Sequence, residues 1–230
     1  GNPNNNSTLL SNIFQSMYKD FPKIIENPEE FRVQIIYTQI DRNNEQVPIF
    51  TSHKFNVDPE KYFYPASTVK FPAAVLALDK INHLESFGLT KDSKLTIGSD
   101  RDWMESVDND SSSETGNASI AHYIKKIFVV SDDNAFNRIY EFLGQDYFNE
   151  RMWAIGYPDI RFRHRLSIRL SAEENKYTNS FDFFSDKGNR LFSQPSNYSS
   201  INLSLNSKEN FIGDSYLLDG EKIDNQMDFS

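Results

Sequence analysis

The sequence contains no cysteine, which excludes disulfide bonds, catalysis by a thiol and metal sites built from thiolates. Basic residues are also scarce, with 24 Lys and Arg against 33 Asp and Glu and a net charge of -9. A nucleic-acid-binding face has to be basic to neutralise phosphates, so nucleic acid is not an expected partner. No apolar run reaches the length of a transmembrane helix. The four histidines are scattered without ligand spacing, so no metal site is expected.

Aromatic residues, in contrast, are abundant. They make up 14% of the chain, with 19 Phe and 11 Tyr, which is typical of a folded globule rather than a disordered chain. At 230 residues the chain is long enough to bury a sizeable core, either as one domain or as two packed lobes.

The N-terminal part has the pattern of a helix followed by a β-hairpin. Apolar residues recur at helical spacing from Thr8 to Ile25. Alternation from Phe31 to Tyr37 then predicts a half-buried strand. A polar turn at Asp41–Glu45 separates it from a returning strand at Val47–Phe55.

A Ser-x-x-Lys motif, Ser67 to Lys70, begins the next apolar stretch. Good helix formers follow it, so a largely buried helix is expected from Ser67 to about Leu84. Because proline is tolerated only near the first turn of a helix, Pro72 places Ser67 at the N-terminus of this helix. Residues three apart share one helix face, so the two side chains can meet at the positive end of the helix dipole. That field and burial both disfavour the ammonium form of Lys70, as a general base requires.

The motif has a second, structural interpretation. Serine is a favoured helix N-cap, and Lys70 can simply point into solvent. Spacing alone does not decide, since the chain holds another copy at Ser16–Lys19. That copy is expected in the middle of the first helix and is interpreted as incidental.

A polar corner separates two further apolar helices. One is expected to end at Ile120–Val130, and the other carries apolar residues from Ala135 to Leu143. Ser131, Asp132, Asp133 and Asn134 lie between them. Taken alone, Ser131 or Asp132 is a helix cap. A short corner between two buried helices can also present a side chain to a ligand.

Together, "ASTVKFPAAV" and "SDDNAFN" in this order resemble the class A serine β-lactamases and the related penicillin-recognising peptidases. The resemblance covers about Phe31 to Leu166, and Ala135 and Asn137 fit the continuation of the corner motif. It implies an α+β fold in which a helical lobe packs against an α/β lobe with an antiparallel sheet. It also implies a small-molecule partner, a β-lactam or a peptidoglycan fragment, no metal or cofactor, and an exported protein of the periplasm or cell envelope.

The resemblance implies a role for each motif residue. Ser67 would attack an amide carbonyl and be acylated, Lys70 would accept its proton, and Ser131 would pass a proton to the departing nitrogen. Asp132 would anchor the corner. Trp103 is a candidate wall of the substrate site, with ordinary packing as the alternative.

The third corner position departs from the family pattern. The family has an asparagine there, which donates to the substrate and touches the lysine. An ungapped match gives Asp133, and a carboxylate beside Lys70 would favour the ammonium form and could not donate. If the corner bulges by one residue, Asn134 fills the position instead.

Two other family features are missing from the sequence. Class A enzymes hold the hydrolytic water with a glutamate and an asparagine four residues later. Here the corresponding region has Glu173-Glu174-Asn175, with Glu174 as the deacylation candidate and a solvated loop carboxylate as the alternative. Nor is there a Lys-[Ser/Thr]-Gly motif near the C-terminus, since Lys187-Gly188 lacks the middle residue.

Three segments are expected. Residues 1–60 would form the helix and hairpin of the α/β lobe, 61–170 the helical lobe with both motifs, and 171–230 a polar extension. That extension has short apolar patterns only around Ile201–Leu205 and Tyr216–Leu218. The sheet is therefore expected to be incomplete, with further strands beyond Ser230. The predicted function is a serine hydrolase, weak or inactive as this chain. The alternatives are a non-catalytic binding domain of the cell envelope or an esterase using the same pair.

Overall fold

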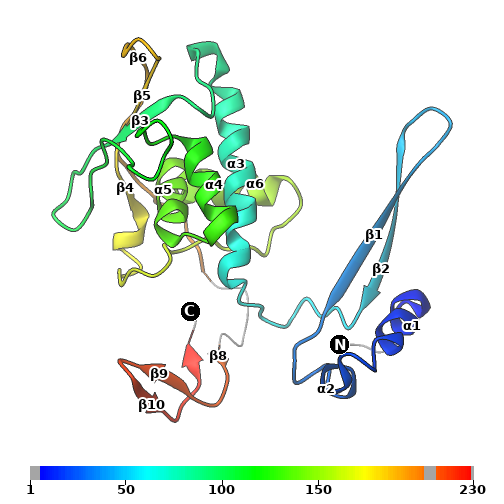
Figure 1. Cartoon of the computed structure of the whole chain (residues 1–230). Coiled ribbons are helices and arrows are strands. Elements are labelled where there is room, and N and C mark those ends of the chain that lie inside the picture. Colours follow the sequence, from blue (N-terminus) through cyan, green and yellow to red (C-terminus); the bar gives the residue numbers. More distant parts are fainter. Residues whose placement is uncertain (1–5, 205–210, 229–230) are drawn as a thin grey trace. The chain divides into compact units, whose positions relative to one another are not determined.

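A computed structural model of the chain describes residues 6–204 and 211–228. Its contacts divide the chain into two compact units. The larger unit runs from Tyr64 to Asn206, and the smaller comprises the chain up to Phe63 together with the segment after Asn206. Each unit is described by itself (Figure 1).

The N-terminal segment forms two short helices where a single helix was predicted over Thr8 to Ile25. Helix α1 spans Thr8–Ser16 and α2 spans Pro22–Glu26. The single-helix prediction was wrong because of Pro22. Its ring clashes with the carbonyl of a preceding helical turn and it has no N–H to donate, so it begins a helix and cannot continue one.

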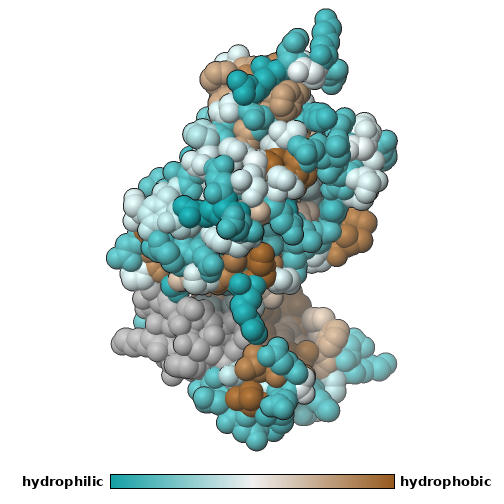
Figure 2. All heavy atoms as spheres, turned by 90° about the vertical axis from the view of Figure 1, so that its left-hand side faces the viewer, coloured by the Kyte–Doolittle hydropathy of each residue, from teal (hydrophilic) through white to brown (hydrophobic). Residues whose placement is uncertain are grey.

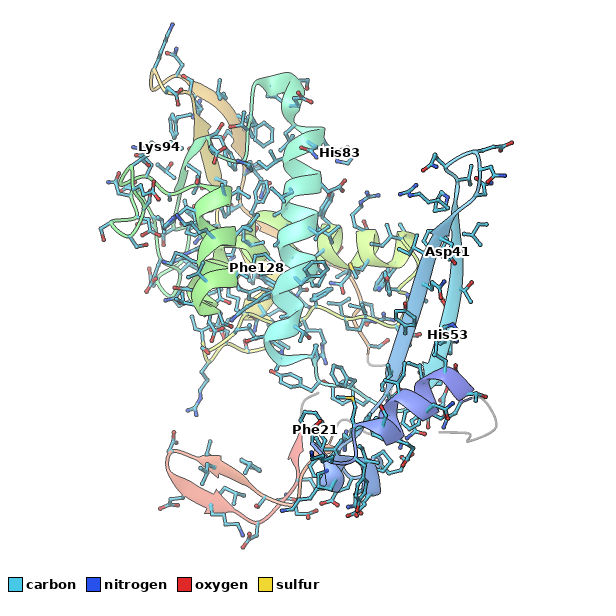
Figure 3. The ribbon with its side chains drawn as sticks, turned by 45° about the vertical axis from the view of Figure 1, so that its right-hand side comes forward. Phe21, Asp41, His53, His83, Lys94 and Phe128 are labelled. Carbon is cyan, nitrogen blue, oxygen red and sulfur yellow. The ribbon has the colours of Figure 1, made fainter. Side chains whose placement is uncertain are left out.

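A β-hairpin follows, formed by antiparallel strands β1, Ile35–Arg42, and β2, Pro48–Phe55. This confirms the predicted hairpin, with a first strand that begins and ends later than its sequence pattern suggested. Asp41 and His53 mark the two strands in Figure 3. Phe55 packs with Leu10, Phe14 and Ile25 in a small core, and the rest of the hairpin is mostly exposed. The prediction that the first strand is half-buried was therefore wrong beyond Ile35, because no described element outside the hairpin covers the apolar side chains that follow.

Four α-helices form the centre of the larger unit (Figure 1). A 3₁₀ turn at Ala66–Val69 leads into α3, Lys70–His83, so the helix predicted from Ser67 starts as a tighter turn. The two predicted helices around the polar corner are confirmed as α4, Ile120–Val130, and α5, Asp133–Leu143. Helix α6, Gln145–Ala154, follows directly after Gly144.

A three-stranded antiparallel sheet of order β3-β5-β6 packs on these helices. Its strands are β3, Lys94–Ile97, β5, Phe181–Phe184, and β6, Arg190–Gln194. Alternate residues of β3 and β5 point into the core, where the Phe142 ring of α5 lies 5.7 and 5.5 Å from the rings of Phe181 and Phe183. Sequence analysis missed these three strands.

The predicted polar extension over residues 171–230 therefore contains sheet strands, and its first part belongs to the larger unit. A short pair, β4 at Tyr177–Thr178 and β7 at Asn197–Tyr198, also lies there. Residues 201–204 form no strand, and Leu205 lies outside the described residues.

The segment after Asn206 consists of two small strand pairs. The inner hairpin pairs β9, Tyr216–Leu218, with β10, Glu221–Ile223, and β8, Phe211–Ile212, pairs with β11, Met227–Asp228. The structure is thus a mixture of helices and small antiparallel sheets, which agrees with the predicted α+β class.

The surface matches the acidic, polar composition. Figure 2 shows a largely hydrophilic face of the larger unit with separate hydrophobic patches. Over the described residues, no helix combines the length and the apolar character that crossing a bilayer requires.

Candidate active site

Lys70, the first residue of α3, lies at the centre of the site. Its side chain is only 4% exposed, so the amine is removed from bulk water. Nζ lies 3.3 Å from Ser67 Oγ, 2.9 Å from Ser131 Oγ and 2.5 Å from the Ser131 carbonyl oxygen. A fourth contact, of 2.5 Å, joins Nζ to Asp133 Oδ1. The structure therefore brings the Ser-x-x-Lys motif and the polar corner together, although they are about 60 residues apart.

Ser67 lies in the 3₁₀ turn before α3 and is exposed, as a nucleophile must be. The turn is held by two contacts to the Pro65 carbonyl, from the Thr68 backbone N–H at 3.0 Å and from the Thr68 hydroxyl at 2.6 Å. Ala66 has a φ of 46°, in the left-handed region that residues with a Cβ seldom adopt. Such backbone strain concentrates at functional sites.

Two residues of the corner between α4 and α5 make different contacts. Ser131 ends α4 in the left-handed conformation, with φ 53°, and presents both its hydroxyl and its carbonyl to Lys70. Asp132 is the N-cap of α5, where its carboxylate accepts from the Ala135 N–H at 2.8 Å. It also lies 3.5 Å from the amine of Lys126 on α4, so it ties the two helices together.

Asp133 fills the third position of the corner, and its Oδ1 accepts a hydrogen bond from Lys70. Its second oxygen, Oδ2, accepts a hydrogen bond from the hydroxyl of Ser167. The hydrogen bonds from Lys70 and then Ser167 hold the pKa of Asp133 below its ordinary value. Asn134, the alternative for this position, is exposed and has no contact with Lys70 among the described residues.

The loop that carries Ser167 is clamped by Asn137 of α5, which is 6% exposed. Its side-chain amide donates to the Leu166 carbonyl at 2.9 Å, and its oxygen accepts from the Leu166 N–H at 2.8 Å. Both backbone groups of Leu166 are thus satisfied by one buried side chain, which fixes the next residue beside the site.

A buried ion pair supports the same loop one turn further along α5. Arg165 and Glu141 have side chains 3% and 4% exposed, and Nε lies 3.3 Å from Oε1. Arg165 also donates to the Tyr177 carbonyl at 2.7 Å, and Arg138 lies 3.5 Å from Glu141. Two charges removed from water require such partners, so the pair anchors the loop to α5.

The deacylation candidate is held elsewhere in the described structure. Glu174 accepts from both the backbone N–H and the hydroxyl of Ser171, at 2.7 Å each. Glu173 pairs with Lys176 at 3.0 Å. Neither carboxylate contacts Ser67 or Lys70 among the described residues.

Trp103, the other outlying candidate, is half-buried and packs edge-on against Tyr177 with ring centres 6.4 Å apart. It makes no described contact with the two motifs. Over the part of the chain that the structure describes, no cluster of three or more His, Asp or Glu is arranged to hold a metal ion.

One of three comparisons with known proteins found a match. The family model described as "Beta-lactamase enzyme family" matches residues 17–201 of the 230. The chain belongs to the β-lactamase enzyme family. Membership supports a function of the serine hydrolase type, and the matched range contains both motifs and the clamped loop. Comparison with curated proteins found no match. Comparison with solved structures found none either.

For the candidate site of this family member, sequence analysis missed Ser167 and the Arg165–Glu141 pair, and it assigned no contact to Asn137. Ser167 and the Arg165–Glu141 pair carry no local signal, because their partners lie 34 and 24 residues away. Asn137 did carry one, since it fits the continuation of the corner motif. A buried amide on a helix face is a signal for a backbone clamp, and the sequence placed Asn137 among apolar residues of α5.

Proposed function

We propose that this member of the β-lactamase enzyme family is a serine hydrolase in which Ser67 is acylated by a β-lactam or a peptidoglycan-type amide. One observation carries the proposal. The Lys70 amine lies between two hydroxyls, 3.3 Å from Ser67 Oγ and 2.9 Å from Ser131 Oγ. A buried amine shared by two hydroxyls is suited to moving a proton from one to the other.

The first step forms a bond between Ser67 Oγ and the substrate carbonyl carbon. The hydroxyl proton passes to the free-base form of Lys70, and the carbonyl oxygen becomes an oxyanion near the positive end of α3. The C–N bond then breaks. Ser131 gives its hydroxyl proton to the leaving nitrogen and takes one from Lys70, so the protons balance and an acyl ester remains on Ser67.

Deacylation is proposed to be slow. Hydrolysis of the ester needs a base that activates water. Glu174 is bound to Ser171 and Glu173 to Lys176, so neither is directed at Ser67. The expected behaviour is therefore that of a peptidase, an esterase or a penicillin-binding protein rather than a fast β-lactamase. Peptidoglycan and the β-lactams that target its synthesis are encountered outside the cytoplasm, so the proposed location is the periplasm or cell envelope.

The test is intact-protein mass spectrometry after incubation with benzylpenicillin, followed by peptide mapping. The expected result is one covalent adduct per chain, located on Ser67 and persistent after free penicillin is removed. An adduct that disappears within the first turnovers would contradict slow deacylation. Incubation with a p-nitrophenyl ester separates an esterase from an amide-specific enzyme, because only the former would release nitrophenolate in repeated turnovers.

A non-catalytic binding domain is the second candidate, and the Asp133 contact favours it. The carboxylate 2.5 Å from Lys70 stabilises the ammonium form, which cannot accept a proton from Ser67. Under this alternative benzylpenicillin or a peptidoglycan fragment binds reversibly. Equilibrium dialysis would then show binding while the mass of the protein stays unchanged.

A further inference from the structure

The loop after α6 brings one hydroxyl to the charged centre of the site. Ser167 Oγ donates to Asp133 Oδ2, while Asp133 Oδ1 accepts from Lys70. The two oxygens of one carboxylate are thus divided between the loop and α3. Ser167 has a φ of 55°, which is uncommon for a residue with a Cβ. The clamp of Asn137 on Leu166 holds the adjacent residue in place.

A hydroxyl that donates to an ionised carboxylate has two effects. It fixes the rotamer of the carboxylate, and it withdraws negative charge from it. Charge that Asp133 shares with Ser167 is no longer available to hold Lys70 as an ammonium. Loss of the hydroxyl would therefore leave more of the carboxylate charge facing Lys70 and strengthen the ion pair.

Other charged groups of the surrounding elements have partners of their own. Among the cations on the elements around the corner, Lys126 of α4 pairs with Asp110 and Asp132, Arg138 of α5 with Glu105 and Glu141, and Arg165 of the loop with Glu141. Of the described charged groups, Lys70 is the one paired with Asp133. Among the described groups, the negative charge of the Asp133 carboxylate is therefore shared between Lys70 and Ser167.

We propose that Ser167 is a positioning residue that acts through Asp133: by holding one carboxylate oxygen, it weakens the ion pair that competes with transfer of the Ser67 proton to Lys70. The kinetic part of this inference rests on the proposed function, and the contact itself does not. The loop hydroxyl thereby weakens the attraction of the Asp133 carboxylate for the Lys70 amine.

The first experiment needs no substrate. The carboxyl carbons of isotopically labelled aspartate are followed by NMR through an acid titration, with Asp133 assigned from its missing signal in Asp133→Asn. Ser167→Ala should move the Asp133 midpoint upward by about one pH unit, as expected when a charged hydrogen bond is lost. Ser167→Thr, which keeps the hydroxyl, should titrate like the wild type. Ser167→Gly removes the hydroxyl without the cost of a left-handed Cβ, and should match Ser167→Ala.

The second experiment measures the pH dependence of acylation by benzylpenicillin. The inflection should move upward in Ser167→Ala and downward in Asp133→Asn. An unchanged Asp133 midpoint in both Ser167→Ala and Ser167→Gly, or an equal shift in Ser167→Thr, would overturn the inference. If the wild type forms no adduct but Ser167→Ala still shifts Asp133, the proposed function fails and the Ser167 contact stands.

Discussion

The chain carries the Ser-x-x-Lys spacing twice, and the two copies have different surroundings. Ser16 is the last residue of α1, where its hydroxyl donates to the Ile13 carbonyl at 2.7 Å, and Lys19 lies exposed in the turn beyond. The prediction that this copy lies mid-helix was wrong, because the helix ends before Pro22. Ser67 lies just before α3, and the Lys70 amine is buried against the corner between α4 and α5.

The comparison shows what turns this spacing into a candidate site. In the first copy the serine hydroxyl donates within its own helix and the lysine side chain is exposed to water. In the second copy the amine is desolvated, next to a serine hydroxyl and close to another. The difference comes from burial and from the α4–α5 corner, since the local spacing is the same.

The largest expected contrast is between the two serines. Ser67→Ala should abolish the penicillin adduct, because it removes the proposed nucleophile. Ser16→Ala should leave the adduct unchanged, because the Ser16 hydroxyl donates within its own helix. Intact-mass measurement of both variants makes the comparison. Retention of the adduct in Ser67→Ala would show that another residue is modified.

The two lysines should differ next most. Lys70→Met keeps an unbranched chain one atom shorter but removes the proton acceptor, and should lower the acylation rate about 10²- to 10⁴-fold, the usual contribution of a general base. Lys19→Met should react at the wild-type rate. Stopped-flow acylation with a chromogenic cephalosporin measures both. Equal rates for the two variants would remove Lys70 from the mechanism.

Breaking the buried ion pair that supports the loop beside Lys70 is expected to lower the stability of the protein. Glu141→Ala leaves the buried Arg165 guanidinium without its carboxylate and should lower the free energy of unfolding by about 3–5 kcal/mol. Glu114→Ala is the matched control, since its pair with Lys125 is exposed to solvent and should contribute little to stability. Urea denaturation of both variants provides the comparison, and similar losses would contradict the assignment of an anchoring role to Glu141.

A third lysine, Lys80 on α3, sharpens the contrast between buried and exposed amines. Burial lowers its pKa from 10.5 to about 8, although the amine donates to the Phe142 carbonyl and to Gln194. The unfolded chain binds this proton more tightly, so charged Lys80 destabilises the fold below pH 8. The penalty disappears as the pH rises from 8 towards 10.5.

Lys80→Met should therefore lack this pH dependence. The free energy of unfolding of the wild type should rise relative to Lys80→Met by about 3 kcal/mol across that window. Parallel denaturation curves at the two ends of the window give the difference. Lys19→Met serves as the control, because an exposed lysine should leave the pH dependence unchanged. A constant offset between wild type and Lys80→Met would contradict the effect of burial.

Local patterns in the sequence were sufficient for much of the fold. Helices α4 and α5 follow from apolar residues at helical spacing, and the β1–β2 hairpin follows from alternation around a polar turn. Strand β5 also alternates, with Phe181 and Phe183 inward, but its four residues lie in a polar stretch. Of its two partners, β6 follows after a short turn, whereas β3 is distant in sequence. Short strands gain their stability from packing on the helices, which a local window does not contain.

The sequence by itself determined which side chains could do chemistry: Ser67, Lys70 and Ser131, each placed at a helix boundary by its neighbours. Only the tertiary structure decided which of them meet, that Asp133 rather than Asn134 faces Lys70, and that Ser167 supports Asp133. The physical reason is that capping and periodicity act within a few residues of the chain. The proton affinity of a buried lysine depends on charges and hydroxyls that the fold brings from 60 residues away or more.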